Sequence, residues 1–448
     1  MAKFKKIIQS QYAIYVLFLL LTICWSVKAS TVCAIISAIY MITLLLFCTD
    51  IKNAFAPILY ISFFIQFDFD RSHLIVYFIA FGLLILSLIY YLVKHIVKYK
   101  LTLQKGNMFW GFVCLAVAFL LGGLFFKIRP LEKLVMVGAV LVAYLFYFIA
   151  INFCENLKPF LLKTIMAGAV ALSIETIILL ISSGDVLSAI IDRKVTQVGA
   201  QNINVVSLFI CLGMLSAFGL GHKNKYDYLY YIIATFLALS VCLCFCRMNI
   251  ALAGLAFVGL TTYSFATSEN KVQYTLVITV TCLFVIAFSK DLSIIVGSIL
   301  SKFGSGGNGR NYLWPWCWDK FTENPWFGVG FISDETVPSL NTVVKIILAH
   351  NTVLQYFTSV GVIGTIIVAY FYYKKYKVCF TRPSAQNAFL IMLIIFIELT
   401  GLTDQAPTMD LFVLLLTTLT LASIEKNTQG DFAYKKLNYK TDHIKKVD

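Results

Sequence analysis

Apolar residues run along this chain in long blocks that short polar stretches separate. Most blocks are about 20 residues long, the length that an α-helix needs to cross the hydrocarbon core of a membrane. We expect about fourteen spans (12–14), at residues 11–28, 31–48, 54–67, 73–93, 108–126, 132–152, 160–182, 203–221, 228–246, 249–267, 273–289, 346–372, 386–402 and 408–423. The blocks do not alternate over about ten residues, as the strands of an outer-membrane barrel do. The pattern predicts an all-α polytopic integral membrane protein.

The composition excludes most other classes of protein. Of the 448 residues, 60% are hydrophobic and 13% charged, and the mean hydropathy is +0.85. Soluble domains carry about 25% charged residues, so this chain could not hide its apolar surface in one core. Most of the 12 cysteines lie in apolar blocks and only Cys317 lies in a long polar loop, which argues against a disulfide scaffold.

The basic residues predict the orientation. An even number of spans puts both termini on one side, and a cytoplasmic assignment of that side places most lysines inside, as the positive-inside rule requires. The expected inner clusters are Lys94/Lys98/Lys100/Lys105, Lys158/Lys163, Lys223/Lys225, Lys374/Lys375/Lys377 and the tail lysines from 435 onward. The net charge of +14 is therefore explained by topology, and we expect no nucleic-acid partner.

The arginines sort to the opposite side. Only Arg382 falls inside; the other five lie on the outer side or at outer helix ends: Arg71, Arg129, Arg193, Arg247 and Arg310. Arginine stays charged when partly buried and binds phosphate or carboxylate with two parallel hydrogen bonds. The outer arginines therefore indicate an anionic ligand, although arginines that snorkel to outer headgroups would give the same distribution.

The spans and loops divide the chain into six regions. These are N-terminal helices (1–182), an outer loop (183–202), further helices (203–289), a large outer loop (290–345), C-terminal helices (346–423) and a basic cytoplasmic tail (424–448). Long loops between short ones commonly carry function, so we expect the chemistry at the large outer loop. This loop returns to the membrane at His350, whose imidazole can accept a proton near neutral pH.

Several motifs occur in one order. They are Arg193, Gly199 and Asn202-Ile-Asn204; Cys246-Arg247; Arg310-x-x-x-Trp314 continuing to Pro325-Trp-Phe-Gly-Val-Gly330; His350-Asn351 with Gly361-Val-Ile-Gly364; and Gly401-Leu-Thr-Asp404. The set resembles the O-antigen ligase and O-antigen polymerase family, chiefly over residues 193–364. Ile203 stands where the family usually has proline, and Cys246 where it has serine.

The resemblance implies a GT-C-like membrane glycosyltransferase architecture in the bacterial cytoplasmic membrane. The donor would be a glycan on polyprenyl pyrophosphate at the outer face, and transfer would invert the sugar without a metal or other cofactor. The expected partners are the lipid-linked glycans, membrane lipid, a flippase and a chain-length regulator. We expect a polymerase, because polymerases are the more divergent group and the first 180 residues match the family only in hydropathy.

The resemblance also assigns roles to residues. Arg310 and Arg247 would stabilise the pyrophosphate leaving group, and His350 would take the proton of the acceptor hydroxyl. The expected substrate-binding residues are Arg193, Asn351, Asn202, Asn204, Glu398 and Asp404. Gly361 and Gly364 would permit close helix packing. Glu175 and Glu398 lie within spans, where they would pair with arginines or bind sugar hydroxyls.

Three alternatives stay open at this point. A ligase would transfer the finished glycan to a lipid A–core sugar, and no residue separates it from a polymerase. A flippase or transporter also has many spans and buried acids, although its polar residues usually lie near the membrane midplane. Asp68-Phe-Asp70 could hold a divalent cation in a metal-dependent transferase, and magnesium dependence would reveal it.

Overall fold

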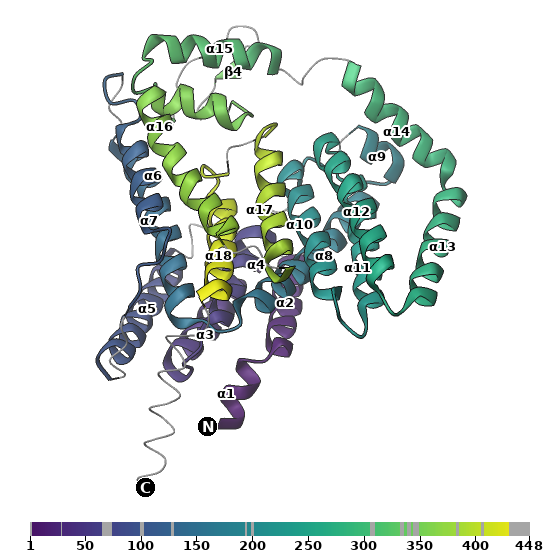
Figure 1. Cartoon of the computed structure of the whole chain (residues 1–448), viewed down its shortest axis with the longest axis horizontal. Coiled ribbons are helices and arrows are strands. Elements are labelled where there is room, and N and C mark those ends of the chain that lie inside the picture. Colours follow the sequence, from purple (N-terminus) through teal and green to yellow (C-terminus); the bar gives the residue numbers. More distant parts are fainter. Residues whose placement is uncertain are drawn as a thin grey trace. The chain divides into compact units, whose positions relative to one another are not determined.

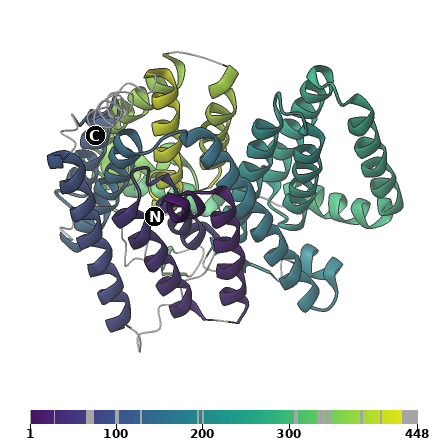
Figure 2. The ribbon, with the colours of Figure 1, turned by 90° about the horizontal axis from the view of Figure 1, so that it is seen from below.

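The computed structural model (Figures 1 and 2) is built almost entirely from helices. It describes residues 2–27, 29–64, 74–98, 103–126, 130–192, 195–198, 201–304, 310–331, 336–337, 342–343, 349–381, 385–404 and 407–429. The chain forms two compact units, unit 1 with residues 1–104, 149–291 and 426–448, and unit 2 with residues 105–148 and 292–425. Each of the fourteen predicted spans contains a helix.

The elements that lie in unit 1 follow the apolar blocks closely. They are α1 (Ala2–Ile8), α2 (Gln11–Ser26), α3 (Ser30–Phe47), the 3-10 turn Lys52–Ala54, α4 (Phe55–Phe64), α5 (Leu74–Val93) with the π turn Lys94–Lys98, α8 (Leu157–Ser182), α9 (Val186–Ile191), β1 (Gln197–Val198), β2 (Gln201–Asn202), α10 (Ile203–Gly221), α11 (Asp227–Leu243), α12 (Arg247–Thr267) and α13 (Lys271–Ala287). Strands β1 and β2 pair antiparallel. The predicted outer loop 183–202 therefore contains a short helix and a hairpin.

The remaining elements are α6 (Phe109–Leu121), α15 (Arg310–Glu323), β3 (Thr336–Val337), β4 (Thr342–Val343), α16 (Thr352–Phe380) and α17 (Ala385–Gly401) in unit 2, and α7 (Pro130–Phe153), α14 (Ser289–Gly304) and α18 (Leu411–Gln429) at the boundaries. Much of the predicted large outer loop is thus helical. The predicted tail begins too early, because Glu425 is buried in α18 and accepts a hydrogen bond from the Tyr147 hydroxyl.

Among the described residues, six helices are long and apolar enough to cross a membrane, and α10 is the most buried of them. In unit 1, α10 packs between α8 and α11, and α2 lies beside α3 and α4 (purple in Figures 1 and 2). Gly213 permits the close approach of α10 to α8, because an added Cβ would lie 2.1 Å from the Cβ of Ala169. By contrast α5, α12 and α13 expose apolar side chains, as expected for helices that face lipid.

Helix α16 of unit 2 is broken, and its bend is visible in Figure 1. The break lies at Gly361, whose φ of 66° and ψ of −170° are not helical. Residues 325–331, which we call the bracing segment, supply the backbone partners that the break removes. Val329 N–H and Gly330 N–H donate to the carbonyls of Thr358 and Ser359 at 2.9 and 3.0 Å, and Val362 N–H and Ile363 N–H donate to those of Pro325 and Trp326 at 2.8 and 3.1 Å. The buried backbone therefore stays paired across the break.

Glycines at the break leave room for this contact. A Cβ on Gly361 would lie 2.5 Å from the amide nitrogens of Phe327 and Gly328, and a Cβ on Gly328 would lie 2.5 Å from the carbonyl carbon of Ser359. Both glycines also have positive φ, which other residues adopt at a cost. Gly361 is therefore needed for a helix break and its brace, and the packing of two intact helices is not its role.

Candidate functional site

The first predicted site residue, His350, lies immediately before α16. Its backbone has a φ of 49°, in the left-handed region that few non-glycine residues adopt. Asn351 follows as the N-cap of α16, with its side-chain oxygen accepting from Leu354 N–H at 3.0 Å and its Nδ2 donating to Leu402 O at 3.3 Å. Asn351 thus fixes the start of the helix and, through it, the position of His350.

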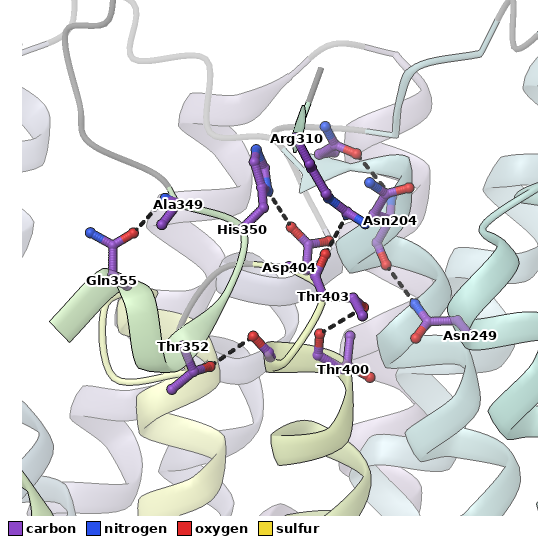
Figure 3. A network of polar contacts seen from close by, with 12 residues as sticks. Asn204, Asn249, Arg310, Ala349, His350, Thr352, Gln355, Thr400, Thr403 and Asp404 are labelled. Carbon is purple, nitrogen blue, oxygen red and sulfur yellow. Dashed lines mark hydrogen bonds and ion pairs between the residues drawn. The ribbon is translucent and has the colours of Figure 1, made fainter. Parts of the chain in front are cut away.

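The side chain of His350 meets Asp404, which lies in the turn after α17 (Figure 3). The distance from Nδ1 to the carboxylate Oδ1 is 3.1 Å, and the side chains are 38% and 18% exposed. A carboxylate at Nδ1 holds the proton on that nitrogen and leaves Nε2 free to accept another. Since the imidazole stays partly exposed, the pair can meet a substrate hydroxyl.

Arg310 reaches the same turn from the N-terminal end of α15. One of its guanidinium N–H groups donates to the carbonyl of Thr403, the neighbour of Asp404 (Figure 3). The turn is also fixed at its start, where the Thr352 hydroxyl donates to Gly401 O at 2.7 Å. A guanidinium has five N–H donors, so this contact leaves donors for an anion. Three predicted residues, His350, Asp404 and Arg310, are therefore brought together by one turn.

Helix α15 is itself held by a buried apolar cluster. Trp316 and Cys317 are buried with Val329 and Ala349, and Leu354 packs against them. The Thr358 hydroxyl adds a hydrogen bond to Cys317 O at 3.1 Å. Burial raises the pKa of the Cys317 thiol to about 12, which makes this cysteine a packing residue and a poor nucleophile.

A second group of predicted residues lies in unit 1. Asn202 is the N-cap of α10 and accepts from Asn204 N–H at 2.9 Å, while Arg247 is the first residue of α12. Asn249, which the sequence did not single out, is buried and donates from Nδ2 to Asn204 O at 3.0 Å and to Ser207 Oγ at 2.5 Å (Figure 3). The structure thus joins the N-terminal ends of α10 and α12, where helix dipoles favour anions.

The two acids predicted to lie within spans, Glu398 and Glu175, do not contact an arginine side chain among the described residues. Glu398 pairs with Lys375 and not with an arginine, and Lys375 is buried against the Tyr372 ring, 3.8 Å from its centroid. Lys375 therefore does not belong to an exposed inner cluster. Glu175 is fully buried, and among the described residues neither of its oxygens has a hydrogen-bond partner.

Some predicted residues lie outside the described residues, namely Arg193 and Gly199, Asp68 and Asp70, and three further arginines, Arg71, Arg129 and Arg382. Their roles stay predictions. Within the part of the chain that the structure describes, no three histidine, cysteine or acidic side chains form a group suited to a metal.

Apolar helices define an integral membrane protein, and His350, Asp404 and Arg310 give it a site suited to proton transfer beside an anion. Residues 207–369 match the sequence model of the family described as O-antigen ligase, in agreement with the resemblance in the motifs. This region contains Arg247, Arg310 and His350, while Asp404 lies beyond it. No curated protein and no solved structure matches the chain. The match supports glycosyl transfer of the O-antigen ligase and polymerase type.

Proposed function

We propose that this protein polymerises surface polysaccharide by joining oligosaccharide repeat units carried on polyprenyl pyrophosphate, at the outer face of the bacterial cytoplasmic membrane. The observation that carries the proposal is the contact of His350 with Asp404 on the turn that also receives Arg310. The family match and the apolar helices support the class of reaction and its setting.

In the proposed reaction, Nε2 of His350 accepts the proton of an acceptor hydroxyl. The hydroxyl oxygen forms a bond to C1 of the donor sugar while the bond from C1 to the phosphate oxygen breaks, which inverts the configuration at C1. Asp404 orients the imidazole and stabilises the imidazolium that forms. The electron pair of the broken bond leaves with polyprenyl pyrophosphate, and the free donors of Arg310 stabilise its charge.

The predicted roles of Arg247 and Arg193 as further donor contacts remain part of the proposal. The joined N-terminal ends of α10 and α12 support an anion contact for Arg247. A flippase and a chain-length regulator are the proposed partners, because repeat units must reach the outer face and the polymer must end at a defined length.

The test is the glycan profile of a deletion strain that carries wild-type protein, His350→Ala or the control His222→Ala. His222 directly follows α10 and its ring packs at a tilt against that of Tyr263, away from His350, Asp404 and Arg310 in the sequence and in a different unit of the chain, so its loss should leave activity intact. Single repeat units without long chains in the His350→Ala strain would support a polymerase. Long chains retained on polyprenyl pyrophosphate would instead indicate a ligase. An unchanged ladder in the deletion strain itself would contradict glycosyl transfer, and an unchanged ladder in the His350→Ala strain would remove His350 from the mechanism.

A further inference from the structure

Trp314 lies next to the residues of the proposed site. It follows Arg310 by one helical turn in α15, so the two side chains share one face of that helix. Its indole Nε1–H donates to the carbonyl of Ala349 at 2.9 Å, and Ala349 directly precedes His350. The tryptophan ring is therefore fixed by a hydrogen bond to the buried backbone that directly precedes His350.

The ring of Trp314 is accessible, although its indole N–H is engaged in the hydrogen bond to Ala349. The residue is 40% exposed, whereas Trp316 on the core side of the same helix is 8% exposed. A tryptophan that anchors a protein in the interface usually turns its N–H to water or headgroups. In Trp314 that donor is used within the protein, so the part of the side chain left open is aromatic surface.

Such a surface suits a sugar ring. The axial C–H groups of a pyranose form an apolar face that packs on the electron-rich face of an aromatic ring, while its hydroxyls remain at the edge. We propose that Trp314 binds the acceptor saccharide by stacking on the ring whose hydroxyl His350 deprotonates. This inference rests on the proposed function and adds the acceptor subsite to it.

The geometry favours the acceptor over the donor as the bound sugar. Trp314 is tied to the residue before His350, and in the proposed reaction His350 is the group that touches the acceptor hydroxyl. Arg310, the neighbour of Trp314 on the helix, is instead tied to Thr403 and is the candidate contact of the pyrophosphate. Loss of the ring should therefore weaken acceptor binding and leave donor binding unchanged.

The test compares two variants of the full-length protein in lipid nanodiscs, Trp314→Phe and Trp314→Leu. Both lose the indole N–H, but only phenylalanine keeps an aromatic face. The probe is the repeat-unit oligosaccharide released by mild acid from the lipid-linked glycan of the producing strain, and its Kd is measured by titration. Tyr312→Ala is the control, because Tyr312 is an exposed aromatic residue on the opposite side of α15.

We expect the Kd of Trp314→Leu to rise about three- to tenfold, with smaller changes in Trp314→Phe and none in Tyr312→Ala. Equal Kd values for the leucine and phenylalanine variants, or no binding of the oligosaccharide to wild type, would overturn the inference. A separate assay measures elongation of lipid-linked repeat units by wild type. Normal elongation with equal Kd values would overturn the acceptor subsite alone, whereas absent elongation would overturn the proposed function and the subsite with it.

Discussion

His350 and Asp404 form a side-chain pair across 54 residues of sequence, with 3.1 Å between Nδ1 and the carboxylate oxygen. The pair closes because the turn after α17 is fastened to the start of α16 by the Thr352 hydroxyl and by Asn351. Asp404 entered the sequence prediction as a substrate-binding residue. In the structure its side chain has a different immediate partner, and this suggests that it acts through the imidazole.

Asp404→Asn should therefore reduce turnover strongly while the protein still folds. The amide keeps the size of the side chain but cannot hold the imidazole in the required tautomer or stabilise its positive charge, and we expect a loss of about 10²-fold or more. The measurement is elongation of lipid-linked repeat units by purified variant and wild type. Turnover like that of wild type would remove Asp404 from the mechanism.

Arg310→Lys should be nearly as inactive as Arg310→Ala. The lysine ammonium is a point charge, so it cannot donate to Thr403 O and at the same time offer a planar pair of donors to pyrophosphate. We expect a drop in turnover of about 10²-fold or more for both variants, measured in the same elongation assay. Arg247→Ala is run beside them, and full activity in that variant would exclude Arg247 from catalysis.

The sequence predicted the helices well because membrane spans are set by local hydropathy. The prediction for residues 203–221 agrees with α10 at both ends, and that for 160–182 agrees with the end of α8. Helix α15 was missed because Arg310, Asn311 and the charged residues near its end make this segment polar on average, as in a loop. Its helical form depends on burial of Trp316 and Cys317 against distant residues.

Contacts between residues far apart in the chain likewise could not be predicted from the sequence. Gly361 was recognised as part of a motif, but only the structure shows that residues 325–331 brace a break there. Glu398 was expected to pair with an arginine or to bind a sugar hydroxyl, and the fold places Lys375 beside it. His350 and Arg310 could be chosen as candidates by their chemistry, but only the structure shows that both side chains contact the same turn.

The two glycines at the helix break, Gly361 and Gly328, should not tolerate even the methyl side chain of alanine. Gly361→Ala and Gly328→Ala each add a Cβ that overlaps backbone atoms at 2.5 Å, at positions with positive φ. The φ alone costs about 1–3 kcal/mol, and the overlap adds to it. Both variants should show lower melting temperature and yield in detergent. Gly138→Ala is the control, since Gly138 lies in α7 with nothing within 4 Å of an added Cβ, and equal stability of all three variants would contradict the bracing role.

Glu132 holds the end of the bracing segment. Its buried carboxylate, in the first turn of α7, accepts from Phe331 N–H. Glu132→Ala leaves a buried donor without this partner and should destabilise the protein by about 1–3 kcal/mol, whereas Glu132→Gln keeps an acceptor oxygen and should retain more stability. Thermal unfolding in detergent measures both.

The control for Glu132 is Glu323→Ala. Glu323 pairs with Lys320 at 2.5 Å on the exposed side of α15, and exposed ion pairs contribute at most about 1 kcal/mol. Equal losses of stability for Glu132→Ala and Glu323→Ala would show that the bond to Phe331 contributes little to holding the segment.

Asp410 should contribute to stability by fixing the start of α18. It caps this helix by accepting from Phe412 N–H at 2.8 Å and Val413 N–H at 3.2 Å. Asp410→Ala removes both of these hydrogen bonds and should destabilise the protein by about 0.5–2 kcal/mol.

Asp410→Asn should retain most of this stability, because asparagine is also a good N-cap. Thermal unfolding in detergent gives the measurement for both variants. Asp185→Ala, at the exposed cap of α9, is the control and should lower the melting temperature less, because the N–H groups it frees can bind water. Equal losses for Asp410→Ala and Asp185→Ala would contradict the role of Asp410 as the cap that fixes α18.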